Sequence, residues 1–198
     1  MKIKKACRKT IDEGVKILRS GGIVAIPTDT VYGIAAMPFN AKAVKKLYKI
    51  KGRSGKKPIA LLVSSKTMVK KFVKNVPFKV KKLIKQYWPG ALTLIFKKKL
   101  SVPAFLTSGL STIGIRMPDN GVALRLIKAA GGALAVTSAN RSGKKPAISA
   151  RDIIKLKSID LVIDGGRCRA GVPSAVIAVQ GNKIKVIRKG ASVDRKLT

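Results

Sequence analysis

Residues 23–33 read IVAIPTDTVYG, an apolar run that passes directly into a turn-forming segment rich in hydroxyl groups. The run Ile23–Ile26 predicts a short strand that stops at Pro27. Similar arrangements are TIGIR at residues 112–116 and the run Leu134–Thr137, which continues into TSAN at residues 137–140. Ligands of open α/β sheets bind beyond the carboxyl ends of the strands. We therefore expect these segments to meet at one binding site.

Other apolar runs and amphipathic segments predict the rest of the fold. The further predicted strands are Ile59–Val63, Ala91–Phe96, Leu161–Ile163, and a hairpin of Ala175–Val179 with Lys183–Ile187 around Gly181-Asn182. The predicted helices are Thr10–Arg19, one capped by Asn40, Lys66–Lys74, Lys79–Tyr87, Val122–Ala130 and Ala150–Leu156. Thr10 with Glu13, and Ser149 with Asp152, have capping-box spacing. We predict one α/β (α+β) domain over residues 1–198, with a core of about 10–190 and a twisted mixed parallel and antiparallel sheet flanked by helices.

The composition excludes several kinds of site. The 198 residues include no histidine, which rules out a Ser-His-Asp triad, a Cys-His dyad and a His-containing zinc site. Cys7 and Cys168 have no metal-ligand spacing, and only eight carboxylates are present. No apolar run is long enough to span a bilayer, and no apolar h-region follows the basic N-terminus. We therefore expect a reduced, cytoplasmic protein without a membrane partner.

The formal net charge of +35 has two interpretations. One is a polyanion partner such as RNA, and the other is a lysine-biased surface. The lysines are scattered along the chain and the few aromatic residues do not interleave with them, which favours the second interpretation for most of the charges. Weak electrostatic binding of tRNA at low salt is still expected from charge alone.

The hexamer RSGKKP occurs at residues 53–58 and again at residues 141–146, both in predicted loops. Basic turns that contain glycine suit phosphates, because backbone amides and lysine side chains both donate to them. Chance repetition is the alternative, since these residues are common in loops and the flanking residues differ. We expect the first copy to be the functional one. Neither copy has the Walker A spacing.

Three further motifs have both a structural and a functional interpretation. Lys51 and Arg53 follow a predicted helix, and taken alone they fit a solvated helix end, where cations favour the dipole. Arg116 ends a strand and can clamp a carboxylate; the alternative is a surface ion pair, for which acidic partners are scarce. TSAN also fits an ordinary Asx turn. We interpret Trp88-Pro89-Gly90 as a core cap and a tight turn.

Six motifs in order carry a specific resemblance: PTDTVYG, KGR followed by KP, WPGALT, TIGIRMP, TSANRSG and GVPSAV. From about Gly22 to Gly190 the chain resembles the short, single-domain form of the YrdC-like family of threonylcarbamoyl-adenylate synthases. The resemblance implies a YrdC-like fold and a nucleotidyltransferase that makes threonylcarbamoyl-AMP and pyrophosphate from L-threonine, bicarbonate and ATP. It also implies Mg²⁺ bound with ATP, no organic cofactor, and downstream transferase proteins that use the product to form threonylcarbamoyladenosine in tRNA.

By motif match, the resemblance assigns two groups of binding residues. The threonine-binding group is Thr30, Tyr32, Arg116, Val136 and Ser174. The ATP-binding group is Lys51, Arg53, Lys57, Thr112, Ser138, Asn140 and Arg188. Lys51 and Arg53 would position the substrates, and no covalent or acid–base residue is assigned. The implied reaction needs positioning and charge neutralisation more than a protein nucleophile, which agrees with a site of arginine, lysine and hydroxyl groups.

The chain departs from the family pattern at three places. Leu62 stands where many longer members carry a histidine, residues 171–175 lack the Glu and Thr that often flank the serine, and Lys144-Lys145 lie in a loop one residue longer. Two alternative functions remain beside this enzyme. One is an RNA-binding or regulatory protein of the same fold without this activity; the other is a carbamoyl-transfer relative, which the absence of accessory domains disfavours. ATP use that depends on threonine and bicarbonate would distinguish the enzyme.

Overall fold

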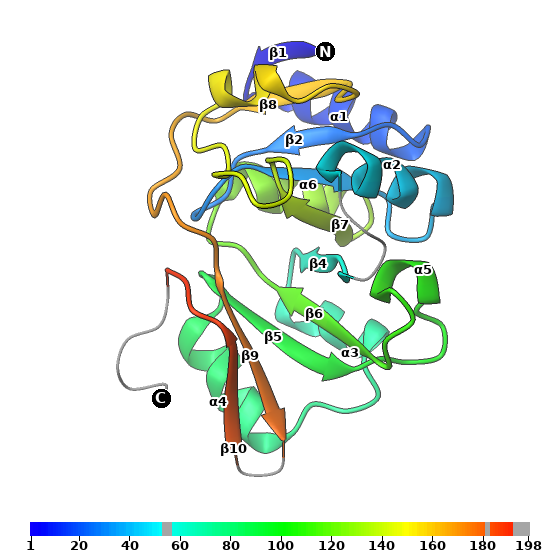
Figure 1. Cartoon of the computed structure of the whole chain (residues 1–198), viewed down its shortest axis with the longest axis vertical. Helices are drawn as coiled ribbons and strands as arrows, with labels where there is room; N and C mark the ends of the chain where they lie inside the picture. The colour runs from blue at the N-terminus through cyan, green and yellow to red at the C-terminus, as the bar shows by residue number, and fades with distance from the viewer. Residues whose placement is uncertain (53–56, 181–182, 192–198) are drawn as a thin grey trace.

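A ten-stranded mixed sheet forms the centre of the computed structural model, which describes residues 1–52, 57–180 and 183–191 (Figure 1). The strands are β1 (Lys2–Lys5), β2 (Val24–Ile26), β3 (Gly33–Ala36), β4 (Ala60–Val63), β5 (Leu92–Lys97), β6 (Thr112–Arg116), β7 (Ala133–Ser138), β8 (Leu161–Asp164), β9 (Ala175–Gln180) and β10 (Lys183–Arg188). Their order across the sheet is β1-β8-β2-β3-β7-β4-β6-β5-β9-β10. Pairs such as β4–β6 are parallel and pairs such as β4–β7 are antiparallel, so the predicted mixed α/β sheet is confirmed.

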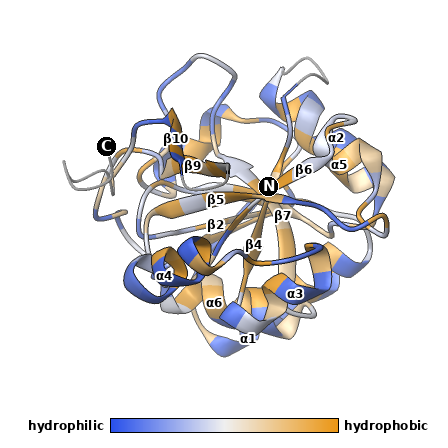
Figure 2. Ribbon diagram, turned by 90° about the horizontal axis from the view of Figure 1, so that it is seen from below, coloured by the Kyte–Doolittle hydropathy of each residue, from blue (hydrophilic) through white to orange (hydrophobic). Residues whose placement is uncertain are grey.

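Helices cover both faces of this sheet (Figure 2). One face carries α1 (Arg8–Arg19), α3 (Val69–Phe72), α4 (Phe78–Tyr87) and α6 (Gly121–Ala129), and the other carries α2 (Ala41–Lys51) and α5 (Ala104–Thr107). Two short 3₁₀ helices are η1 (Lys66–Met68) and η2 (Arg151–Lys155). Asn40 caps α2 as predicted, since its Oδ1 accepts from Ala43 N at 3.0 Å. Gly52, with φ of 55°, turns the chain out of α2 directly after Lys51.

Two clusters of buried apolar side chains hold the layers together. The smaller lies under α1 and α6 and includes Leu18, Leu126 and Leu161, all fully buried. The larger lies under α2 and α4 and includes Leu47 and Leu83. Full burial of one large apolar side chain contributes about 1.5–3 kcal/mol, so these clusters stabilise the strands whose ends carry the polar motifs.

The first helix begins earlier than predicted. It starts at Arg8, two residues before Thr10, with Cys7 as its N-cap. The predicted capping box of Thr10 and Glu13 is wrong, because the helix begins before Thr10 and both side chains have other partners. Thr10 is buried with its hydroxyl 3.2 Å from Cys7 Sγ, and Glu13 accepts from Lys4 Nζ on β1 at 2.7 Å.

Two other predicted helices are partly of the 3₁₀ type. The segment predicted as Lys66–Lys74 divides into η1 and α3. The segment predicted as Ala150–Leu156 forms η2. Ile153 within this helix and Leu156 directly after it are both buried. Their separation of three residues matches the three-residue period of a 3₁₀ helix. Asp152 does reach back as predicted, since its Oδ2 accepts from Ser149 N at 2.9 Å.

The sequence patterns missed β1, β3 and α5. The side chains of β1 are all exposed and show no apolar period, and the strand exists because it pairs in parallel with β8. β3 lies partly in the loop motif, and it pairs antiparallel with β2 and β7. β9 and β10 pair antiparallel as predicted, but the turn residues Gly181-Asn182 lie outside the described residues. Within the described ranges, no helix combines the length and the apolar character that crossing a membrane requires.

Candidate functional site

A cavity of about 680 Å³ brings together the ends of β2, α2, β6, β7 and β10. Ligand cavities for molecules of nucleotide size fall in this range of volume. Ten of the twelve residues assigned from the sequence line it. These are Thr30, Tyr32, Lys51, Lys57, Arg116, Val136, Ser138, Asn140, Ser174 and Arg188.

The other two assigned residues lie elsewhere. Thr112 opens β6 and pairs with Lys97 of β5, and it is absent from the described residues that line the cavity. Arg116, at the opposite end of the same strand, does line it. Arg53 lies outside the described residues.

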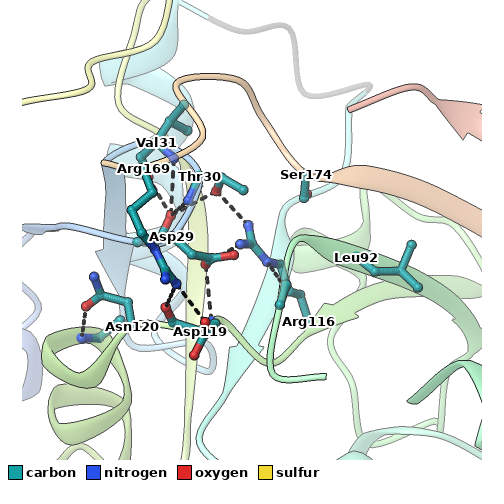
Figure 3. Close-up of polar contacts among 12 residues, drawn as sticks. Asp29, Thr30, Val31, Leu92, Arg116, Asp119, Asn120, Arg169 and Ser174 are labelled. Atoms are coloured by element: carbon teal, nitrogen blue, oxygen red, sulfur yellow. Dashed lines mark hydrogen bonds and ion pairs between the residues drawn. The ribbon is translucent and has the colours of Figure 1, made fainter. Parts of the chain in front are cut away.

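Three oxygen atoms hold the Arg116 guanidinium at the end of β6 (Figure 3). Nε donates to Gly90 O at 2.8 Å, Nη1 to Thr30 Oγ1 at 2.9 Å, and Nη2 to Asp29 Oδ1 at 2.5 Å. Arg116 is 5% exposed and Asp29 is 8% exposed, so the ion pair is buried. Acidic partners are scarce in the sequence, yet Arg116 has one, in a buried ion pair rather than a surface one, because the PTDT segment folds against β6. Burial lowers the pKa of Arg116, and the attraction of Asp29 opposes that effect.

The Trp88-Pro89-Gly90 turn supports the arginine as well as the core. Trp88 is buried, and its Nε1 donates to Leu92 O at 2.7 Å. Gly90 N donates to Met117 O at 2.9 Å, which ties the turn to the end of β6. The turn therefore has the structural role predicted for it and also presents the Gly90 carbonyl to Arg116.

The segment from Thr28 to Tyr32 is fixed by its own hydroxyl groups. Thr28 Oγ1 accepts from Thr30 N at 3.1 Å and lies 2.9 Å from Thr30 Oγ1, which in turn accepts from Arg116. Tyr32 is fully buried, and its hydroxyl donates to Gly166 O at 2.8 Å. Burial raises the pKa of Tyr32, so the phenol stays protonated at neutral pH. The Thr30 hydroxyl thus points at Arg116, while the Tyr32 hydroxyl is hydrogen-bonded to Gly166, in the segment that follows β8.

Lys51 forms a second polar corner with the TSAN segment. Its Nζ donates to Ser138 O at 2.9 Å, to Ser138 Oγ at 3.1 Å and to Asn140 Oδ1 at 2.5 Å. Asn140 Nδ2 donates to Lys144 O, which fixes the orientation of the amide. Lys51 is only 5% exposed. The interpretation as a solvated helix end is therefore wrong: the ammonium is directed inward, onto the end of β7.

The second RSGKKP copy also reaches the cavity, through its middle residues and Pro146. Ser142 N donates to Lys51 O at 2.8 Å, and Ser142, Gly143 and Lys144 are among the lining residues. Arg141 and Lys145 are exposed and do not line the cavity. Of the first copy, Lys57 and Pro58 line the cavity.

A third corner joins β5, β9 and β10. Arg188 donates from Nη2 to Ser174 O at 2.7 Å and to Ser174 Oγ at 3.2 Å. Ser174 Oγ lies 2.8 Å from Thr93 Oγ1, and both hydroxyl groups are buried. Ser174 thus links an arginine on the last described strand to the interior of the sheet.

Three groups that shape the cavity were not assigned from the sequence: Asp29, Thr93 and the Gly90 carbonyl. Thr93 carried a usable signal, since it is a polar residue within the apolar run Ala91–Phe96. Asp29 stands inside a recognised motif and is one of only eight carboxylates. Leu62 lines the cavity beside Arg116, its partner across β4 and β6, so the wall there is apolar.

The charge of the cavity is positive. Lys51, Lys57, Arg116, Lys144 and Arg188 line it, whereas no carboxylate occurs among its described lining residues. The sequence also holds no Asp or Glu between Asp29 and Asp119. Hydroxyl groups and fixed cations of this kind bind carboxylates and phosphates through charge-assisted hydrogen bonds. Among the described residues, no group of three or more potential metal ligands is found.

The chain is similar to known proteins along most of its length. Residues 16–190 match the Sua5/YciO/YrdC family model, whose description is "Telomere recombination". A threonylcarbamoyl-AMP synthase of Pyrococcus abyssi is 39% identical over 162 residues, which are 81% of this chain and 48% of the relative. A protein of Methanocaldococcus jannaschii is 38% identical over 192 residues, which are 96% of this chain and 90% of the relative.

A solved structure, that of P. abyssi Sua5 complexed with L-threonine, has a TM-score of 0.90 at 34% identity over 96% of this chain and 56% of that one. The chain therefore spans about half the length of the P. abyssi protein, at 48%, and most of the M. jannaschii protein.

Proposed function

Because the chain belongs to the Sua5/YciO/YrdC family, we propose that it makes threonylcarbamoyl-AMP and pyrophosphate from L-threonine, bicarbonate and ATP. One observation carries the proposal: a cavity joins a buried arginine and its hydroxyl partner Thr30 to further lysine and arginine side chains. An amino-acid carboxylate and a polyphosphate are two anions that such a cavity suits. The name of the P. abyssi relative supplies the reaction that would join them.

Threonine would bind at the Arg116 corner. Arg116 and Thr30 would hold its carboxylate, with Ser174 and the Val136 backbone nearby. The unprotonated amine then attacks the carbon of bicarbonate, and the loss of water leaves a carbamate. A carbamate oxygen attacks the α-phosphorus of ATP, the bond to the β-phosphate oxygen breaks, and pyrophosphate leaves. The protein's part is to position the two substrates and to neutralise their charge.

ATP would bind at the two other polar corners of the cavity, those of Lys51 and Arg188. Lys51, Lys57 and Arg188 would hold its phosphates, supported by Ser138 and Asn140; Arg53 and Thr112 are included on motif match. Hydrogen bonds to Ser138 and Asn140 already fix Lys51, so its charge needs no reorganisation as the pyrophosphate leaves. Mg²⁺ would enter with ATP, on phosphate oxygens and water, because the described cavity residues offer it no carboxylate.

The product would pass to transferase proteins that form threonylcarbamoyladenosine in tRNA, and the reaction would take place in the cytoplasm. A second candidate is RNA binding without this activity. The charge distribution favours some RNA contact, because the absence of Asp and Glu between Asp29 and Asp119 leaves that half of the chain uniformly basic. Such contact is compatible with the enzyme and would serve to hold a tRNA weakly.

Pyrophosphate release by the purified chain tests the proposal, with threonine, bicarbonate and ATP omitted one at a time. We expect release only when all three are present. Lys51→Met should reduce the rate by about a hundredfold or more, as for loss of one fixed donor. The matched control is Glu13→Gln, which breaks the distant ion pair with Lys4 and should leave the rate of pyrophosphate release unchanged. Release that persists without threonine and bicarbonate would contradict the proposal.

A further inference from the structure

We propose that Asp29 is a positioning residue, which fixes the Arg116 guanidinium in the orientation that receives the carboxylate of the amino-acid substrate. The inference rests on the proposed function, because it takes an amino acid as the ligand of Arg116. Nothing in the motif match assigns a role to Asp29.

Asp29 can act on a ligand only through another residue. Its neighbours Thr28, Thr30 and Val31 line the cavity, whereas Asp29 does not. Its carboxylate lies beside the Arg116 guanidinium, where Oδ1 accepts from Nη2 at 2.5 Å (Figure 3). The residue is 8% exposed, so its charge faces the protein interior rather than solvent.

The three bonds of Arg116 leave room for a ligand. A guanidinium has five N–H groups. Gly90, Thr30 and Asp29 take one each, from Nε, Nη1 and Nη2. One N–H on each terminal nitrogen remains outside the bonds that the described residues make. Two neighbouring donors are what a carboxylate needs for bidentate binding, provided that the plane of the guanidinium is fixed.

Asp29 is itself fixed from two sides. Oδ1 also accepts from Asp119 N at 3.2 Å, in the segment that follows β6. The backbone carbonyl of Asp29 accepts from Ala170 N at 3.1 Å, in the segment that leads to Ser174. Arg169 pairs with Asp119 at 2.6 Å on the outside of this contact (Figure 3). Because one segment holds the carboxylate and another holds the backbone of the same residue, Asp29 can define the orientation of the arginine instead of following it.

The rival explanation is that Asp29 only neutralises a buried charge. In that case its carboxylate would compete with the substrate carboxylate for Arg116, and removal of its charge would tighten threonine binding. The two explanations therefore predict changes of opposite sign in the affinity for a ligand that carries a carboxylate.

The test compares L-threonine with L-threoninamide, which lacks the carboxylate charge, by titration calorimetry on the full chain. We expect Asp29→Asn to lower the ratio of threonine affinity to threoninamide affinity by tenfold or more. The affinity for ATP should change by less than twofold. Glu13→Gln, which removes an exposed acidic partner on α1, should leave both quantities unchanged. If Asp29→Asn does not fold, Asp29→Ser gives the same readout, since its smaller side chain lets water reach the guanidinium.

An unchanged ratio, tighter threonine binding, or equal losses for threonine, threoninamide and ATP would each overturn the assignment. The assay of pyrophosphate release by the unaltered chain tests the proposed function independently of Asp29. If that release occurs and the ratio does not change, the role of Asp29 fails and the reaction stands. If the ratio falls but no pyrophosphate is released, the role of Asp29 is supported and the proposed reaction is overturned.

Discussion

Replacement of Arg116 by alanine is expected to weaken threonine binding far more than ATP binding. The change removes the guanidinium that Gly90, Thr30 and Asp29 hold at the end of β6. Loss of a charge-assisted bidentate contact costs about 1.5–3 kcal/mol. At about 1.4 kcal/mol per tenfold, the dissociation constant for threonine should rise by one to two orders of magnitude. ATP, which we propose to bind at the Lys51 and Arg188 corners, should lose no contact.

The same change leaves Asp29 buried without a cation. Breaking a buried ion pair from one side costs about 3–5 kcal/mol of the free energy of unfolding. Single domains have about 5–15 kcal/mol in total, so the variant should fold but unfold at lower urea concentration. Arg116→Lys is the matched variant: it restores a charge near Asp29 but cannot reach all three oxygen atoms together. It should recover part of the stability and little of the threonine affinity.

Titration calorimetry with threonine and with ATP, and urea unfolding followed by circular dichroism, measure these quantities. Unchanged threonine affinity in Arg116→Ala would remove the arginine from the site. Equal losses for threonine and ATP would show that Arg116 does not act on threonine alone, and would refute the reasoning.

Three further predictions concern the basic turns, the net charge and η2. Arg53→Ala with Lys57→Ala should abolish ATP binding, whereas Arg141→Ala with Lys145→Ala should change it by less than about tenfold, roughly 1.4 kcal/mol; equal losses at one salt concentration would show that both loops contact the phosphates. The logarithm of RNA affinity should fall steeply and linearly with the logarithm of salt concentration, without sequence preference; a shallow slope with selectivity for one tRNA would contradict this. Asp152→Ala should lower the free energy of unfolding at neutral pH by about 0.5–1 kcal/mol, because the carboxylate accepts two backbone N–H bonds. Those bonds lower the pKa of Asp152, so its contribution is present above the unfolded-state pKa of about 3.9 and is lost as pH falls through the folded-state value; an equal difference between the proteins at neutral pH and near pH 2 would exclude this cause.

The sequence predicted the central strands and the residues that follow them. Ile23–Ile26 and Thr112–Arg116 are apolar runs whose ends carry Thr30 and Arg116, and strand ends converge by the geometry of the sheet. Most helices were also predictable, because the spacing of their apolar residues shows which face is buried. β1 was not, since its pairing with β8 depends on a partner far along the chain.

The pairings inside the site were less predictable. Asp29 and Arg116 are 87 residues apart, and their contact depends on the order of β2, β3, β7, β4 and β6 across the sheet. Lys51 fits a solvated helix end by local rules. It is buried because Ser138 and Asn140, 87 and 89 residues further on, supply its acceptors. Local pattern therefore identified the residue types at the site, while tertiary structure decided which of them are paired and buried.

The most direct test of the central claim is to identify the product by mass spectrometry. The unaltered chain is incubated with ATP, Mg²⁺, L-threonine and bicarbonate labelled with heavy carbon. If the cavity joins the two substrates, one adduct should contain AMP, threonine and the labelled carbon, and pyrophosphate should form in equal amount. ATP consumed without a labelled adduct, or an adduct that lacks threonine, would contradict the account.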